Sequence, residues 1–299
     1  MFKTLNHIVI SLISKVPKTI IKKFANQYVA GITIGDVLDK VQNLNDLGLC
    51  ATVDILGEHT KEILETQKIT NDYCDILTEI DKRKLNCNIS IKPSHIGTDI
   101  SNKLFTDNLN MIQKTANSYN NFVRIDMENS KLTNISLKTY QLSLQTSNNI
   151  GIVLQAYLHR TYDDLNKLDS NSNIRICKGI YNESEKISFK KKEEINKNYI
   201  RLLKLALSKK IYVGIATHDP LLISQSLKII KSMNITDEMF EFQMLYGVPM
   251  KKYINRILDY KYKIRIYVPF GPNWYDYSIR RIKENPNISK YVIQNLFKK

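Results

Sequence analysis

Ionisable side chains stand at the ends of several apolar, β-branched runs in this sequence. In the run 121–128 (NFVRIDME), aliphatic and charged residues alternate, and Asp126 comes near the end. An unpaired buried charge costs several kcal/mol, so Asp126 requires a cationic partner. Lys92 ends an earlier run, 88–92, and neighbouring strands lie about 5 Å apart. We therefore expect a Lys92–Asp126 ion pair beside a ligand site; two solvated loop charges are the alternative.

A second group of charges surrounds a glycine in the run 174–181 (IRICKGIY). Gly179 permits close approach of a ligand to the backbone, and Arg175 and Lys178 supply positive charge beside it. This pattern suits a phosphate-bearing cofactor, whereas a lone glycine in a strand also occurs as a simple bulge.

A third group lies near the C-terminus, where Pro272 can open a helix just after Gly271. Such a helix brings Arg280, Arg281 and Glu284 within one turn. Two guanidinium groups there can clamp one carboxylate, with Glu284 orienting one of them. An exposed basic turn is the other interpretation.

Three histidines, His95, His159 and His218, also lie near run ends, which raises a metal-dependent hydrolase as a hypothesis. The first run carries no HxH pair, and the chain has no HExxH motif. We therefore expect no metal. His218 is suited either to hydrogen-bond a cofactor or to cap the following helix.

Eight apolar runs must position these residues. Between them lie stretches long enough for helices, many with apolar residues at helical spacing, such as Tyr199, Leu202 and Ala206. Eight strand–helix alternations predict an α/β fold, a (β/α)8 barrel, whose chemistry gathers at the carboxyl ends of the strands. The runs are 51–56, 88–92, 121–128, 150–158, 174–181, 211–218, 240–246 and 264–270.

Composition predicts one domain over residues 1–299, with 1–30 as an N-terminal helical extension. The 299 residues are 43% apolar, and no glycine- or proline-rich linker divides them. The net charge of +15 comes from lysines spread along helices, without a nucleic-acid-binding signature, so we expect an anionic cofactor or membrane surface and no nucleic acid. The apolar patch 8–13 is too short to span a bilayer and either packs on the barrel or lies on a membrane. Four cysteines without paired spacing indicate reduced thiols and a cytosol-like compartment.

In their order along the chain, these segments closely resemble the flavin-dependent proline dehydrogenases of the monofunctional, bacterial type. The likeness runs from about Phe24 to Asn287. It is carried by LGE (56–58), SIK (90–92), RIDME (124–128), QAYLHRT (155–161), KGIYNE (178–183), ATHD (216–219), FEFQMLYG (240–247), YVPFG (267–271) and RRIKENP (280–286). The resemblance implies a distorted, TIM-like (β/α)8 barrel that binds FAD without a covalent bond.

The same resemblance implies a role for each matching residue. Asp126 and Lys92 form the charged pair beside the substrate, and Tyr267 packs on the substrate ring. The proline carboxylate is gripped by Arg280 and Arg281, held by Glu284, in a pocket walled by Tyr181 and Leu245. The flavin contacts are Arg175 at its reactive edge, Lys178, Gly179 and Ile180 along it, Met127 and Gln155 at the isoalloxazine, and Thr217 and His218 near the remainder of FAD.

The implied reaction is hydride transfer from C5 of L-proline to flavin N5, giving Δ1-pyrroline-5-carboxylate in the first step of proline catabolism to glutamate. Electrons then pass to a quinone, and a separate pyrroline-5-carboxylate dehydrogenase takes the product. The enzyme is expected in the cytoplasm, with peripheral contact at the inner face of the cytoplasmic membrane. Ile180 departs from the alanine frequent in the family. Two alternatives are a hydroxyproline dehydrogenase, which Tyr267 disfavours by filling the space of a ring hydroxyl, and a non-catalytic barrel that binds an anion or a membrane.

Overall fold

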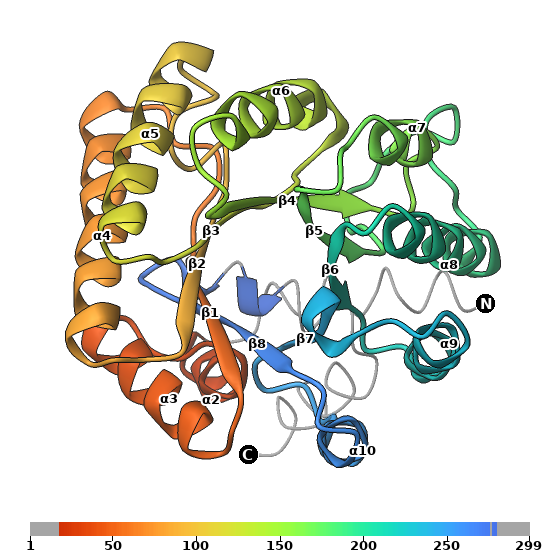
Figure 1. Ribbon diagram of the computed structural model, residues 1–299. Helices are drawn as coiled ribbons and strands as arrows, with labels where there is room; N and C mark the ends of the chain where they lie inside the picture. Colours follow the sequence, from red (N-terminus) through yellow and green to blue (C-terminus); the bar gives the residue numbers. More distant parts are fainter. Residues whose placement is uncertain (1–17, 276, 280–299) are drawn as a thin grey trace, which may run out of the picture.

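Eight parallel strands close into a barrel in the computed structural model, which describes residues 18–275 and 277–279 (Figure 1). Each strand pairs with the next along the chain, and the last pairs with the first. The strands are β1 (Cys50–Ile55), β2 (Cys87–Ile91), β3 (Val123–Ile125), β4 (Ile150–Gln155), β5 (Asn173–Cys177), β6 (Tyr212–Ala216), β7 (Phe240–Leu245) and β8 (Ile264–Phe270). Every predicted run overlaps one strand, so the predicted barrel is confirmed.

Helices cover the outside of this barrel (Figure 1). Local signals set where they begin: Thr33 and Asp36 form a capping box at α3, and Asp219 caps α9 ahead of Pro220. The helix expected around Tyr199 is α8. The helices are α2 (Lys18–Tyr28), α3 (Ile34–Asp46), α4 (Ile63–Lys82), α5 (Asn102–Ser118), α6 (Thr133–Leu144), α7 (Thr161–Asn166), α8 (Lys192–Ser208), α9 (Pro220–Ser232) and α10 (Lys251–Asp259).

The interior of the barrel is polar. Side chains alternate between the two faces of a strand, so Val123 and Ile125 pack outward against helices while Arg124 points inward. The hydroxyl of Tyr267 on β8 donates to Asp126, directly after β3, at 2.8 Å, and a bond between non-neighbouring strands must cross the interior. Branched aliphatic residues fill the usual barrel of this type. Here the interior instead carries Thr52, Asp54, Asn88, Ser90, Arg124, Arg175, Glu241, Gln243, Arg265 and Tyr267.

The barrel departs from the regular pattern at the seam between β8 and β1. In a regular barrel each strand is followed by its covering helix, so the seam would be covered after β8. Here α3, which precedes β1, packs on both β1 and β8. The chain after β8 instead contributes Asn273 and Tyr277 to the lining of a cavity. This arrangement is the distortion that the resemblance implied.

The helix α2 is attached to the carboxyl ends of the last two strands. The amide of Ala30 donates to Pro269 O at 2.9 Å, and Gln27 Nε2 donates to Gly247 O at 3.3 Å. A Cβ on Gly247 would lie 1.8 Å from Gln27 O, so this approach requires glycine. Residues 1–17 of the predicted extension lie outside the described residues, and the single-domain assignment stays a prediction.

Within the described residues, no helix combines the length and apolarity needed to cross a bilayer. The four cysteines are free thiols, as expected from their spacing.

Candidate active site

A cavity of about 740 Å³ opens at the carboxyl ends of the strands. Thirteen of the predicted site residues line it: Lys92, Asp126, Met127, Gln155, Arg175, Lys178, Gly179, Ile180, Tyr181, Thr217, His218, Leu245 and Tyr267. Arg280, Arg281 and Glu284 lie outside the described residues. The prediction did not include Asp54, Glu58, Glu128, Asp219, Gln243, Asn273 and Tyr277, which line the same cavity.

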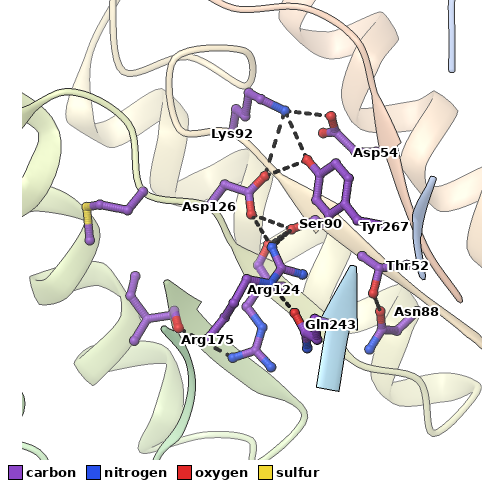
Figure 2. Close-up of polar contacts among 12 residues, drawn as sticks. Thr52, Asp54, Asn88, Ser90, Lys92, Arg124, Asp126, Arg175, Gln243 and Tyr267 are labelled. Atoms are coloured by element: carbon purple, nitrogen blue, oxygen red, sulfur yellow. Dashed lines mark hydrogen bonds and ion pairs between the residues drawn. The ribbon is translucent and has the colours of Figure 1, made fainter. Parts of the chain in front are cut away.

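Asp126 is the centre of the polar contacts in this cavity (Figure 2). Its Oδ1 accepts from Ser90 Oγ at 2.6 Å and from Arg175 Nη1 at 2.8 Å. Its Oδ2 accepts from the Tyr267 hydroxyl at 2.8 Å and lies 3.7 Å from Lys92 Nζ. The predicted Lys92–Asp126 pair is therefore present, but the guanidinium of Arg175 is the nearer cation. Through hydrogen bonds to its two oxygens, the Asp126 carboxylate connects the end of β3 to side chains of β2, β5 and β8.

Lys92 has a nearer partner in Asp54 of β1, whose Oδ2 accepts from Nζ at 2.6 Å. Burial, aided by the charge of Asp126, raises the pKa of Asp54 to about 6 even though Lys92 opposes the rise. Burial alone would lower the pKa of Lys92, but the attraction of Asp54 and Asp126 outweighs it and raises that pKa. Lys92 is therefore a firmly held cation at neutral pH. The sequence did offer a signal for Asp54, because it is the one charge in the run ATVDIL.

The Arg175 guanidinium is held at two of its nitrogens (Figure 2). Nε donates to Gln243 Oε1 at 2.5 Å, and Nη1 donates to Asp126 as given above. The guanidinium carbon lies 5.2 Å from the centre of the Tyr267 ring. In the part of the chain that the structure describes, Nη2 has no hydrogen-bond partner. A planar guanidinium fixed at two edges thus keeps a donor for a ligand in the cavity.

The segment after β5 is fixed by two neighbours. A Cβ on Gly179, whose φ is +100°, would lie 2.1 Å from the Tyr157 ring, so packing against this ring explains the glycine better than a ligand contact. Lys178 Nζ donates to Asp219 Oδ2 at 2.7 Å. Burial would raise the pKa of Asp219, but the hydrogen bonds from Lys178 and from Leu221 N–H lower it to about 2. Lys178 is thus neutralised by a residue that also caps α9.

Two further side chains bind backbone at strand ends. Gln155 Nε2 donates to Glu128 O at 2.7 Å, and His218 Nε2 accepts from Leu245 N–H at 2.9 Å. His218 does not cap the next helix, because Asp219 does. Ile180 is 57% exposed and lies in the cavity lining.

Glu58, His59 and Glu128 lie close enough together to suggest a metal site. Both oxygens of Glu128, however, accept from Ser94, through its amide at 2.8 Å and its hydroxyl at 2.5 Å. His59 Nδ1 lies 2.8 Å from Asp99. Two of the three candidate ligands are therefore already engaged by the protein.

Comparison with known proteins identifies the family to which the chain belongs. A family model described as proline dehydrogenase matches residues 37–294. The chain belongs to the proline dehydrogenase family. It is 34% identical over 276 residues to proline dehydrogenase 1 of Bacillus subtilis strain 168, a match that covers 92% of this chain and 91% of that protein. It is 30% identical over 280 residues to the proline dehydrogenase of Deinococcus radiodurans, covering 92% and 90%.

A solved structure of a longer protein shares the fold. Proline utilization A (PutA) from Bdellovibrio bacteriovorus, inactivated by N-propargylglycine, superposes with a TM-score of 0.82 at 23% sequence identity. The match covers 92% of this chain and 34% of that one, so this proline dehydrogenase spans about a third of the PutA chain. At this identity the likeness concerns the barrel.

Proline dehydrogenases are flavin-dependent oxidoreductases of proline catabolism. The described residues fit a flavin on two counts. The cavity volume lies within the roughly 300–1,000 Å³ range usual for cofactor sites. Arg175 Nη2 offers a fixed, positively charged donor to the carbonyl or ring nitrogen atoms of such a group.

Proposed function

We propose that this proline dehydrogenase uses FAD to oxidise L-proline to Δ1-pyrroline-5-carboxylate, the first step of proline catabolism to glutamate. The observation that carries the proposal is the Arg175 guanidinium, which lines the cavity, is anchored by Gln243 and Asp126, and has no partner at Nη2 among the described residues. When bound, FAD supplies the acceptor for the hydride that leaves C5 of proline. The protein's part is to hold the two groups in reacting geometry and to exclude water.

In this proposal the flavin lies along the segment after β5. Arg175 donates to its reactive edge, and Lys178, Gly179 and Ile180 follow its length. Met127 and Gln155 contact the isoalloxazine, and Thr217 and His218 contact the remainder. The cation at Arg175 and the net charge of +15 both favour an anionic cofactor.

The substrate side of the proposal is the cluster around Asp126. Lys92 and Tyr267 border the proline ring, with Tyr181 and Leu245 as walls. The hydrogen bond from the Tyr267 hydroxyl to Asp126 holds the phenol over this space, which favours proline over hydroxyproline. Arg280 and Arg281, oriented by Glu284, are assigned to the carboxylate of the substrate on the strength of the family resemblance.

The electron acceptor in this proposal is a membrane quinone, and the enzyme is cytoplasmic with peripheral contact at the inner face of the membrane. The basic, partly apolar N-terminal segment supports this assignment. Removing residues 1–15 should weaken both liposome binding and quinone reduction; no change in either would contradict it. A separate pyrroline-5-carboxylate dehydrogenase would take the product.

The absorption spectrum of the purified protein tests the central proposal. Visible flavin bands that bleach on anaerobic addition of L-proline, with FAD identified after release from the denatured protein, are the expected result. A colourless protein that takes up no FAD would contradict the cofactor assignment. Bands that bleach with hydroxyproline in preference to proline would contradict the substrate assignment.

A further inference from the structure

Below the cavity, the barrel interior holds a buried ion pair that does not line the site. Glu241 of β7 is 2% exposed, and its Oε1 accepts from Arg265 Nε of β8 at 2.7 Å. Arg265 is itself anchored, because Nη1 donates to Ala51 O at 2.7 Å. Burial would raise the pKa of Glu241, but Arg265 outweighs it and the pKa is lowered. Glu241 is therefore an ionised carboxylate at neutral pH.

Gln243 connects this pair to the cavity. Its Nε2 donates to Glu241 Oε1 at 2.6 Å, while its Oε1 accepts from Arg175 Nε at 2.5 Å. An ionised carboxylate only accepts hydrogen bonds, so it requires the NH₂ end of the amide to face it. The opposite orientation would set two acceptors together at Glu241 and two donors together at Arg175. Glu241, which only accepts, and Arg175, which only donates, thus both require the orientation in which the oxygen of Gln243 meets Arg175.

Arg175 depends on this hydrogen bond for its orientation. The only other anchors on the guanidinium among the described residues are Asp126 and Ser90, and both act through Nη1. Without the hydrogen bond at Nε, the guanidinium can turn about the remaining anchor, and Nη2 no longer has a fixed position. A group that is positioned at one edge alone loses part of its preorganisation.

We propose that Glu241, held by Arg265, is a positioning residue for Arg175 that acts through the amide of Gln243. The proposal rests on the function proposed above, in which Arg175 faces the flavin. Glu241 lies two residues before Gln243, about 7 Å farther down the strand, so it acts on the ligand only through this chain of contacts.

A double-mutant cycle tests the proposal in the flavin-loaded enzyme, with the variants Glu241→Gln, Gln243→Met and both together. Two quantities are measured: kcat/KM for proline and the reduction potential of the bound flavin. Glu241→Gln alone should lower kcat/KM about tenfold, as the loss of outer partners does at other sites. It should also make the potential more negative, because a fixed positive charge favours the electron-rich flavin. In the Gln243→Met background, Glu241→Gln should change neither quantity.

Thr52→Val is the matched control. Thr52 is as buried as Glu241, and its hydroxyl donates to Asn88 at 2.5 Å inside the same barrel, without contact to Gln243 or Arg175 (Figure 2). This variant should retain wild-type kcat/KM and potential. An equal loss in Thr52→Val and Glu241→Gln would assign the effect to general damage of the interior and overturn the proposal.

Additive effects in the cycle, with flavin bound and bleached by proline in the wild type, would overturn the positioning role and leave the proposed function intact. A wild-type chain without flavin would overturn both. If Glu241→Gln does not fold, Glu241→Asp keeps the charge for Arg265 but shortens the reach to Gln243. Glu241→Asp should then lower kcat/KM on its own and change nothing in the Gln243→Met background. Additive effects of Glu241→Asp and Gln243→Met would also refute the proposal.

Discussion

Asp126→Asn is the most direct perturbation of the site, because it preserves the shape of the side chain and removes its charge. Asp126 receives hydrogen bonds from Ser90, Arg175 and Tyr267, and Lys92 lies 3.7 Å away. Leaving one half of a buried, hydrogen-bonded charge pair without its partner costs about 2–5 kcal/mol. Lys92 keeps Asp54 as a partner at 2.6 Å, so the loss falls mainly on Arg175 and the value belongs in the lower half of this range.

A loss of about 3 kcal/mol corresponds to a decrease in kcat/KM of about two orders of magnitude. The assay is steady-state oxidation of L-proline, normalised to bound flavin, with thermal unfolding measured on the same samples. Asp164→Asn is the matched control, because Asp164 is also buried and pairs with Arg160 at 2.7 Å but lies outside the cavity lining. The control should lose stability and keep kcat/KM per bound flavin. Wild-type kcat/KM in Asp126→Asn at full flavin content would refute the reasoning.

Three further changes test other parts of the site. Arg281→Ala should weaken proline binding by roughly 2–5 kcal/mol and so raise the KM for proline, while flavin is retained. An unchanged KM in steady-state assays would contradict the assignment of Arg281 to the substrate carboxylate. Folding raises the pKa of Asp54 from 3.8 to about 6, so the folded state favours the protonated form. The stabilisation that the protonated Asp54 carboxyl group gives the folded state is complete below pH 3.8 and is lost as pH rises through about 6. Between about pH 4 and pH 8 the wild type should therefore lose roughly 3 kcal/mol relative to Asp54→Asn in urea unfolding, and parallel pH curves would contradict this. Gly179→Ala should lose about 1–3 kcal/mol more in the same measurement than Gly48→Ala, because both glycines have positive φ but a new Cβ meets the Tyr157 ring only at Gly179. Equal losses in the two variants would show that no such clash occurs.

The barrel could be predicted because eight apolar runs mark eight strands, but the ends of the strands could not. The run 121–128 contains a strand of only three residues, Val123–Ile125, and Asp126, directly after it, lines the cavity. The alternation of charged and aliphatic residues led to Lys92 as a partner of Asp126, but it did not identify the nearer cation, Arg175, or any partner of Arg124. Arg124 binds Asn173 O at 2.9 Å and is not paired with a carboxylate among the described residues.

The missed residues share one physical cause. Asp54, Glu241 and Gln243 are polar positions in otherwise apolar runs, and each has a partner in or directly after another strand. Only the closed barrel brings Gln243 against Arg175, because β5 and β7 are not neighbours. The register of eight strands sets such contacts, and no single run contains that information. Asp54 stood out as the one charge in its run, but the sequence did not show that its side chain points inward and lies nearer to Lys92 than Asp126 does.

The placement of α3 over the β1–β8 seam has a consequence for biosynthesis. The ribosome releases α3 and β1 early, but β8, the other strand that α3 covers, follows some 200 residues later. Until then Val37, Leu38 and Val41, which are fully buried in the finished protein, lie on a helix that lacks the packing surface supplied by β8. The nascent chain therefore carries an apolar helix face through most of its synthesis, a state that favours aggregation or capture by chaperones. Release of β8 is the event that ends this exposure, so a chain that stops after β7 should remain unclosed and insoluble even though seven strands are complete.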